Sequence, residues 1–303
     1  MPTTTPAGRS QIAAEMGMLG VVFIWGANFS ITKVSIGQVP PLAFTALRFV
    51  IATVALLILV RLFEPSTRTP RSSIKKLAVI GFIGNTVYQP CFILGLANTS
   101  ATNSAVIIGA LPGVVAFLAW ALGIERVTRQ ASIGIGIAML GVLLVVGGGF
   151  ELDRRNILGD LLTVAAVFCW AAYTLGLRRS SEGISPLKVT AITTATGTPG
   201  LVLIGLPQLM RMDWSGVPAS ALAGLGYAAL ISLPFAYFLY NRGVSVLGPS
   251  KASAFSSLIP IAGMALAWVI VHDAPKPSQI AGATLVVAGV WLTRARKPLP
   301  PEG

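Results

Sequence analysis

The sequence predicts an all-α integral membrane protein, with ten transmembrane helices arranged as two inverted-topology repeats of five helices each. Three observations predict this fold class: the apolar composition, the number of apolar runs that could cross a bilayer, and a repeat relating the two halves of the chain. Of the 303 residues, 54% are apolar and 11% are charged, and the mean hydropathy is +0.79. A water-soluble fold cannot enclose that much apolar surface.

The apolar runs are about twenty residues long, which is the length of helix that crosses about 30 Å of hydrocarbon. Each run also contains Gly, Ala, Ser, Thr or Pro, the residues through which transmembrane helices approach one another closely. We number the predicted helices as spans 1 to 10. They cover residues 13–35, 41–62, 76–97, 102–123, 130–148, 158–178, 187–209, 218–240, 251–271 and 278–294.

The basic residues predict how the chain is oriented, because Lys and Arg concentrate in cytoplasmic loops. Most of the 22 Lys and Arg fall on the side that holds the N-terminus and the even-numbered connections. The exceptions are Arg154, Arg155, Arg211 and Lys276 on the opposite side, and Lys33 and Arg48 within spans 1 and 2. We therefore expect a multi-pass protein of the plasma or inner membrane, with both termini in the cytoplasm.

An internal repeat relates spans 1–5 to spans 6–10. An offset of 145 residues places Glu15 on Asp160 and Trp25 on Trp170. An offset of 148 places Pro112 on Pro260, Trp120 on Trp268, Gly134 on Gly282 and Gly141 on Gly289. Residues 1–148 and 149–303 are the predicted domains. Because each has an odd number of spans, the second must be inverted in the membrane, a symmetry typical of transporters with a midplane site.

Several of these residues also form a family pattern. Trp25-Gly26, Phe29, Lys33, Pro41 and Arg48, with the proline of span 4 and the Gly-rich spans 5 and 10, resemble the ten-helix EamA branch of the drug/metabolite transporter superfamily. The resemblance covers about residues 15–295, and within this branch the sequence is similar to amino-acid exporters of the YddG type. It implies metabolite export and a cavity ringed by spans 1, 3, 4, 6, 8 and 9, with spans 5 and 10 peripheral.

Polar and aromatic side chains at mid-helix depth are the candidate substrate-binding groups, because uncompensated polar groups are costly in hydrocarbon. Asn85, Tyr88, Gln89 and Phe92 follow helical spacing and predict one stripe on span 3. Interhelical hydrogen bonding and packing are the alternative for each such residue. The candidates are Asn28, Asn85, Tyr88, Trp170, Tyr173, Tyr237, Asn241 and Ser256. Tyr88 and Trp170 are favoured, since the resemblance implies aromatics at these positions.

Prolines and tryptophans recur at matched depths of the two repeats. Pro112 and Pro260 are expected to kink spans 4 and 9 and to serve as gates, with a static kink as the alternative. Trp120 and Trp268 are expected to be a packing pair whose loss destabilises the fold.

The charged residues favour some chemistries over others. None of the acids lies at the centre of a span, which disfavours proton-coupled export of organic cations. Glu15 is expected to stabilise the start of its own helix. Lys33 and Arg48 are expected to snorkel or to pair with backbone carbonyls, and the alternative is that they bind a substrate carboxylate.

The predicted function is export of small metabolites, expected to be aromatic or other neutral amino acids, by alternating access through a central cavity. The alternatives are a proton-coupled exporter of drugs or organic cations and a receptor or scaffold that transports nothing. The sequence contains no phosphate loop, HExxH or GxSxG, so an enzyme is not expected. Cys91 and Cys169 are expected to be inert. The expected partners are the bilayer and a small-molecule substrate, without nucleic acid, metal or cofactor, and a monomer is compatible with the sequence.

Overall fold

The computed structural model describes residues 6–64, 69–123, 129–147 and 154–293, and the regular elements of these residues are all helices. Eight apolar helical segments are long enough to cross a membrane, and two shorter apolar helices, Ser132–Val145 and Pro277–Leu292, complete the predicted ten spans. The fold class is therefore confirmed as an all-α, multi-pass membrane protein of two five-helix repeats.

Four of the spans are single long helices and two more are single but shorter, whereas spans 3, 4, 8 and 9 are built from consecutive segments. Spans 1 and 2 are α1 (Pro6–Ile36) and α2 (Pro41–Phe63), and spans 5, 6, 7 and 10 are α7 (Arg129–Gly147), α8 (Arg154–Ser180), α9 (Pro186–Arg211) and α14 (Pro277–Thr293). Span 3 runs through α3 (Arg71–Gly81), η1 (Phe82–Val87) and α4 (Tyr88–Asn98), and span 8 through α10 (Ala219–Tyr227), η2 (Ala228–Phe235) and α11 (Ala236–Leu247). Span 4 is α5 (Ala101–Gly109) and α6 (Leu111–Ala121), and span 9 is α12 (Pro249–Phe255), η3 (Ser256–Leu258) and α13 (Ile259–Val271).

The irregular segments of the two halves match at the 148-residue offset. Both η1 and η2 are π-helical, and they end at the equivalent residues Val87 and Phe235. The helical segments that carry the prolines start at the equivalent residues Leu111 and Ile259. Pro112 and Pro260 thus lie in the first turn of new segments, where a missing N–H breaks no helical hydrogen bond. The expected mid-helix kink is in fact a helix break followed by a restart.

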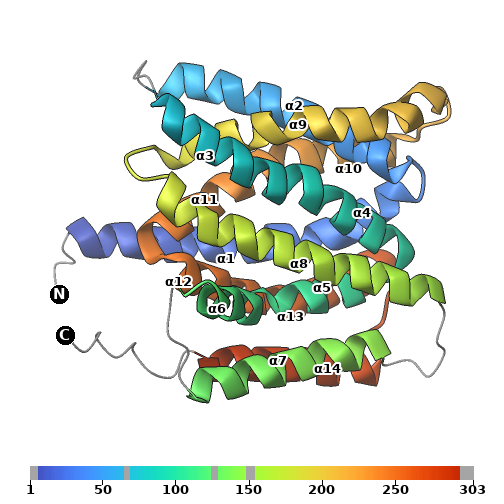
Figure 1. Ribbon diagram of the computed structural model, residues 1–303. Coiled ribbons are helices and arrows are strands. Elements are labelled where there is room, and N and C mark those ends of the chain that lie inside the picture. Colours follow the sequence, from blue (N-terminus) through green and yellow to red (C-terminus); the bar gives the residue numbers. More distant parts are fainter. Residues whose placement is uncertain (1–5, 65–68, 124–128, 148–153, 294–303) are drawn as a thin grey trace.

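The helices pack in layers across the bundle (Figure 1), with α2 and α9 at one edge and α7 and α14 at the opposite edge. Glycines bring α7 and α14 into close contact: a Cβ added at Gly141 would lie 2.6 Å from the carbonyl oxygen of Gly282. A Cβ at Gly289 would lie 2.5 Å from the carbonyl oxygen of Gly134. The repeated glycines of spans 5 and 10 therefore allow close helix packing at the periphery.

The α2–α9 pair is tied at both ends. The Gln208 side-chain oxygen accepts hydrogen bonds from the backbone N–H groups of Leu42 (2.8 Å) and Ala43 (3.1 Å), which satisfies two donors at the start of α2. At the other end, Lys188 Nζ lies 4.0 Å from Glu64 Oε2. These contacts hold α2 against α9.

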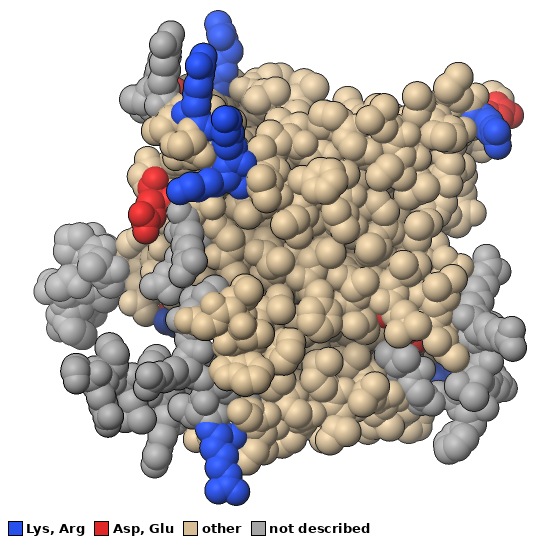
Figure 2. Space-filling model, viewed as in Figure 1, with Lys and Arg blue, Asp and Glu red and all other residues tan. Residues whose placement is uncertain are grey.

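The surface has the charge distribution of a membrane-spanning bundle. Figure 2 shows most of the visible Lys and Arg at the end where α2 finishes and α3 begins, and a broad uncharged surface between the two ends. Large apolar side chains are exposed on the molecule, among them Phe23, Leu203 and Trp291. The prediction of orientation also used basic residues that lie outside the described residues, as both chain termini do. These are Arg68, Arg126, Arg294, Arg296 and Lys297.

The expectation for Trp120 and Trp268 is wrong. Their side chains are 56% and 61% exposed, so they point outward from the bundle rather than pack inside it. The repeat offset correctly gave the two residues equivalent positions along their spans, but equivalence does not decide whether a position faces the core or the lipid.

Candidate functional site

A central cavity, whose empty volume of about 560 Å³ includes space open to solvent, lies where the two repeats meet. Residues from spans 1, 3, 4, 6, 8 and 9 line it, and no residue of α7, α9 or α14 that the structure describes does. Five of the predicted candidates line this cavity: Asn28, Tyr88, Trp170, Tyr237 and Ser256. Span 2, which was not expected to contribute, adds the side chain of Arg48.

Trp170 lies at the centre of an aromatic cluster beside the cavity. Its ring centroid lies 5.0 Å from those of Tyr88 and Tyr237, 4.8 Å from that of Tyr173 and 5.5 Å from that of Trp25. The rings are tilted or edge-on, the arrangements that aromatic pairs prefer. Because Trp170 is only 4% exposed, most of its surface contacts protein, whereas Tyr88, which also lines the cavity, is half-buried.

Three other predicted candidates lie outside the cavity lining and hydrogen-bond to neighbouring helices. Tyr173 donates its hydroxyl hydrogen to Asn241 Oδ1 (3.2 Å), and Asn241 Nδ2 donates to Thr190 Oγ1 (2.7 Å). Asn85 Nδ2 donates to the carbonyl oxygen of Thr193 (2.8 Å). These bonds join α8, α9, α11 and η1, which is the interhelical alternative considered for each polar residue.

The π-helical segment η1 explains why Asn85 leaves the predicted stripe. The stripe assumed α-helical spacing from Asn85 to Tyr88, Gln89 and Phe92, but Asn85 lies in η1 and the other three lie in α4. A π turn contains more residues than an α turn, so Asn85 is rotated away from the face that the others share. Tyr88, Gln89 and Phe92 remain together on the cavity wall.

The expectation that Arg48 snorkels to the surface or pairs with a backbone carbonyl is wrong, because Arg48 is buried on the cavity wall and bonds a side-chain amide. Its side chain is 2% exposed, and its Nη2 donates a hydrogen bond to Gln89 Oε1. The guanidinium carbon lies 5.6, 5.8 and 6.0 Å from the ring centroids of Phe44, Phe49 and Phe92. Cation–π contacts of this kind contribute about 0.5–2 kcal/mol each, which offsets part of the cost of burial. Arg48 Nε is enclosed and has no hydrogen-bond partner.

Gln89 links Arg48 to Tyr237 across the cavity wall. Gln89 Nε2 donates to the Tyr237 hydroxyl oxygen at 3.0 Å, while its own oxygen accepts from Arg48. These two bonds fix which way the amide faces. A tyrosine hydroxyl that accepts a bond still has its hydrogen to donate, so Tyr237 keeps a donor on the lining of the cavity.

Lys33, in contrast, is occupied by backbone groups. Its Nζ donates to the carbonyl oxygens of Leu96 (2.6 Å), Ala97 (3.2 Å) and Thr99 (2.6 Å). These carbonyls lie at the end of α4, where helical hydrogen bonding stops and the helix dipole favours a cation. The expectation that Lys33 pairs with backbone carbonyls is confirmed, and Lys33 does not line the cavity.

Because Arg48 lines the cavity and Lys33 does not, Arg48 determines the charge of the cavity. Among the described residues that line it, Arg48 is the only formally charged one, and no Asp or Glu is present. The cavity wall therefore carries one buried positive charge, aromatic faces and neutral hydrogen-bonding groups. The charge of Arg48 attracts an anionic group and repels a cationic one.

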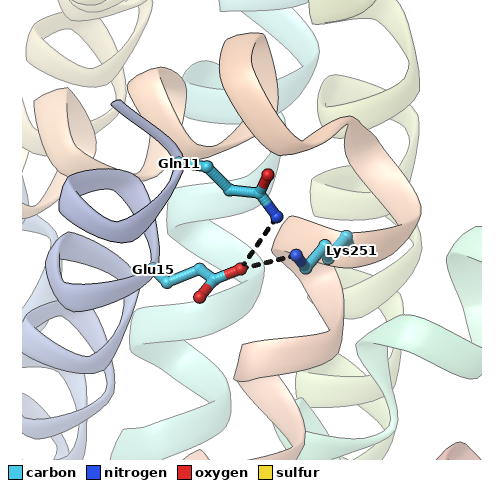
Figure 3. Close-up of polar contacts among 3 residues, drawn as sticks. All are labelled: Gln11, Glu15 and Lys251. Carbon is cyan, nitrogen blue, oxygen red and sulfur yellow. Dashed lines mark hydrogen bonds and ion pairs between the residues drawn. The ribbon is translucent and has the colours of Figure 1, made fainter. Parts of the chain in front are cut away.

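The acids Glu15 and Asp160 lie at the ends of the bundle instead. Glu15 Oε1 lies 2.6 Å from Lys251 Nζ and 3.3 Å from Gln11 Nε2 (Figure 3). The helix α1 starts at Pro6, so Glu15 is not in its first turn, and the expectation that Glu15 stabilises the start of its own helix is wrong. The carboxylate instead joins span 1 to span 9.

The repeat gives this contact a counterpart at the opposite end. Asp160 is 1% exposed and accepts hydrogen bonds from Thr99 Oγ1 (2.6 Å) and Asn103 Nδ2 (3.2 Å). Asp160 is the repeat equivalent of Glu15, and Asn103 is equivalent to Lys251 at the 148-residue offset. One carboxylate thus joins spans 1 and 9 and the other joins spans 6 and 4.

Comparison with known proteins places this architecture among transporters. The EamA-like transporter family matches residues 12–147 and 157–295. The uncharacterized transporter YyaM of Bacillus subtilis is 30% identical over 277 residues, which is 90% of each chain. A probable amino-acid metabolite efflux pump of Salmonella typhimurium is 23% identical over 284 residues, covering 90% of this chain and 91% of the pump. A solved crystal structure with 19% identity shares the fold, with a TM-score of 0.67 over 93% of this chain and 96% of the other.

Proposed function

The chain belongs to the EamA-like transporter family, and we propose that it exports an aromatic or other neutral amino acid through its central cavity. The observation that carries this proposal is the composition of the cavity wall, which combines aromatic rings and neutral hydrogen-bonding groups with a single cation. A zwitterion fits such a wall, because its carboxylate can approach Arg48 and its ammonium group can approach the aromatic faces.

The relatives support the same cargo class. The Salmonella protein that aligns along nearly the whole chain is described as a probable amino-acid metabolite efflux pump. Its similarity is distant, so the residues of the cavity carry more of the argument than the relative does.

Alternating access between residues 1–148 and 149–303 is the proposed mechanism. Each half contributes equivalent irregular spans, and the two inverted halves can exchange conformations around one site. We propose that the end holding Glu15 and Lys251 faces the cytoplasm, because Arg61, Arg71 and Lys75 lie at that end. The bundle then opens alternately at this end and at the end holding Asp160.

The competing function, proton-coupled export of organic cations, is disfavoured by charge. Two like charges 4 Å apart at an effective dielectric constant near 20 repel by about 4 kcal/mol. A cationic solute in the cavity would meet this repulsion from Arg48, and no described lining residue is an acid that could offset it. A zwitterion meets no such penalty.

The experiment that tests the proposal is flux in proteoliposomes. Purified protein is reconstituted, and uptake of labelled neutral amino acids and of labelled tetraphenylphosphonium is measured with and without a pH gradient. We expect saturable uptake of at least one amino acid and none of tetraphenylphosphonium, with protein-free liposomes as the control. Uptake of tetraphenylphosphonium alone would support the organic-cation exporter, and no flux of any compound would support a receptor or scaffold.

A further inference from the structure

We propose that Arg48 is the carboxylate-binding residue of the cavity, and that the solute class is small monocarboxylates, of which neutral amino acids are one kind. The inference rests on the proposed function, because it takes the central cavity as the place where the solute is held. It goes further by naming the group that the protein recognises and by predicting that the solute's amine is dispensable.

The first step is the hydrogen-bonding capacity of Arg48. A guanidinium group has five N–H donors and no acceptor. Among the described residues, the protein satisfies it through one bond, from Nη2 to Gln89 Oε1, and Nε is enclosed without a partner. The group therefore presents more donors than its surroundings use.

The second step is the missing counter-ion. Arginines that are almost fully buried are normally paired with an anion, because an unpaired buried charge is strongly unfavourable. Arg48 is 2% exposed, and the ion pairs of the described residues, Glu64 with Lys188 and Glu15 with Lys251, do not include it. The three phenylalanine rings around it supply cation–π contact but no acceptor. A carboxylate carried in by the solute supplies both the charge and the acceptors.

The third step is the set of donors beside the guanidinium. Tyr237 accepts from Gln89 and so keeps its own hydroxyl hydrogen, and Ser256 Oγ on the cavity lining is buried without a hydrogen-bond partner. A carboxylate can accept about four hydrogen bonds and can take two from one guanidinium. Arg48 provides the charge-assisted bonds, and these hydroxyl groups are available for the remaining lone pairs.

The fourth step compares the two ends of an amino acid. No described acid lines the cavity, so a solute ammonium group meets only ring faces and neutral oxygens such as those of Asn28. The carboxylate meets a full buried charge. Removing the carboxylate from a solute should therefore weaken binding much more than removing the amine.

Matched analogues test this ranking directly. Binding to purified protein in lipid nanodiscs is measured for L-phenylalanine, 3-phenylpropionate, which lacks the amine, and phenethylamine, which lacks the carboxylate. The series L-leucine, 4-methylpentanoate and isoamylamine repeats the comparison with an aliphatic side chain. We expect each amine-free acid to bind within about tenfold of its amino acid, and each carboxylate-free amine to bind at least tenfold more weakly, which corresponds to about 1.4 kcal/mol. Equal binding of the amines, or no binding of the acids in both series, would overturn the inference.

Variants at two positions locate the effect on Arg48. Arg48→Gln should weaken binding of the carboxylates at least about tenfold while leaving the amines unchanged or improved. Lys33→Gln is the matched control: it removes another cation of the first repeat, one bonded to carbonyls, and should lower thermal stability without changing the acid-to-amine ratio. If Arg48→Gln keeps the wild-type ratio, the inference is wrong.

A second variant decides the matter even if Arg48→Gln fails to fold. Gln89→Glu places a carboxylate of the protein next to the guanidinium, so it should maintain or raise thermal stability and compete with the solute for Arg48. We expect carboxylate binding to fall at least about tenfold, and wild-type affinity in a folded Gln89→Glu protein would contradict the proposal.

The outcomes also separate this inference from the proposed function. Amino-acid flux with no preference for carboxylates would reject the role of Arg48 and leave amino-acid export standing. Flux of 3-phenylpropionate without flux of any amino acid would reject amino-acid export and leave the role of Arg48 standing.

Discussion

The Nζ atom of Lys251 lies 2.6 Å from Oε1 of Glu15, and this contact ties the first span of one repeat to the fourth span of the other. The side chains are 47% and 35% exposed, so solvent screens the pair. Its repeat counterpart, Asp160 with Asn103, is buried at the opposite end and carries only one formal charge. The two ends of the bundle therefore carry equivalent contacts that differ in burial and in charge.

The exposed pair should act as a weak closure of its end. Ion pairs of this exposure contribute about 0.2–1 kcal/mol, so Glu15→Gln should shift an open–closed equilibrium at most about fivefold. We expect a cysteine at Ser256 to react with maleimide up to about fivefold faster from that end in Glu15→Gln. The background protein has Cys91 and Cys169 replaced by alanine. High salt should produce the same acceleration without the substitution.

The control for this experiment is Gln11→Ala, which removes only the 3.3 Å hydrogen bond to Glu15. Its labelling rate should match that of the unsubstituted protein. An unchanged rate in Glu15→Gln would show that the ion pair does not close this end.

The buried carboxylate at the other end should matter more for stability. Hydrogen bonds to a charged group contribute about 1.5–3 kcal/mol, and Asp160 accepts from both Thr99 and Asn103. Asp160→Ala should therefore lower the free energy of unfolding by more than Glu15→Ala does, measured by thermal denaturation in the same detergent. Asp160→Asn, which keeps an acceptor for Thr99, should fall between Asp160→Ala and the unsubstituted protein. Equal losses in the two alanine variants would contradict the difference in burial.

Tryptophan substitutions should follow burial rather than position in the repeat. Trp170 packs against five aromatic rings of the described residues, so Trp170→Ala should cost about 3–5 kcal/mol of folding stability. Trp120→Ala and Trp268→Ala remove outward-facing side chains and should each stay within about 0.5 kcal/mol. Differential scanning fluorimetry would measure the order. A larger loss at Trp120 than at Trp170 would mean that Trp120 is buried in a contact between copies of the chain.

Tyr88 offers a cleaner test of binding than Trp170, because its ring is only half buried. Tyr88→Ala should remove stacking worth about 0.5–1.5 kcal/mol, which weakens apparent affinity about two- to tenfold. The melting temperature should change less than in Trp170→Ala. Phe117→Ala, on the outer surface, serves as the control and should leave affinity unchanged. Unaltered affinity in Tyr88→Ala would remove this ring from the solute site.

Membrane orientation can be read from two exposed serines at opposite ends. Ser72 lies in the first turn of α3, and Ser215 lies between α9 and α10. In a cysteine-free background, Ser215→Cys should react with an impermeant maleimide in intact cells, and Ser72→Cys only after permeabilisation. The reverse pattern would place the Lys- and Arg-rich end outside the cell.

The fold could be predicted because the features that determine it, apolar runs and repeated residues, can be recognised within the sequence itself. Hydrophobic length gives the number of spans, and the recurrence of pairs such as Gly141 and Gly289 gives the repeat. Within the site, Tyr88 and Trp170 could be placed near the cavity since aromatic residues at mid-span depth are visible in the sequence.

The remaining features of the site depend on tertiary packing. A lone arginine such as Arg48 in an apolar run looks the same whether it snorkels to the surface or points inward, and only the neighbouring helices decide. Lys33 is also a lone cation near an apolar run, but its Nζ donates to backbone carbonyl oxygens. Trp120 and Trp268 show the related limit, because equivalent depth in two repeats leaves the direction of a side chain undetermined.

The π-helical segments of spans 3 and 8 have a consequence for how the gene can vary. Each holds extra residues relative to an α-helix, and one residue corresponds to a rotation of about 100° around the helix axis. Loss of a single codon within 82–87 would remove an extra residue and convert the π turn to α, so Tyr88, Gln89 and Phe92 would keep nearly the same direction relative to the first part of the span. The same deletion in an α-helical part of the span would rotate the three residues together, so the π segment is the place where this span can lose a codon and keep its cavity wall.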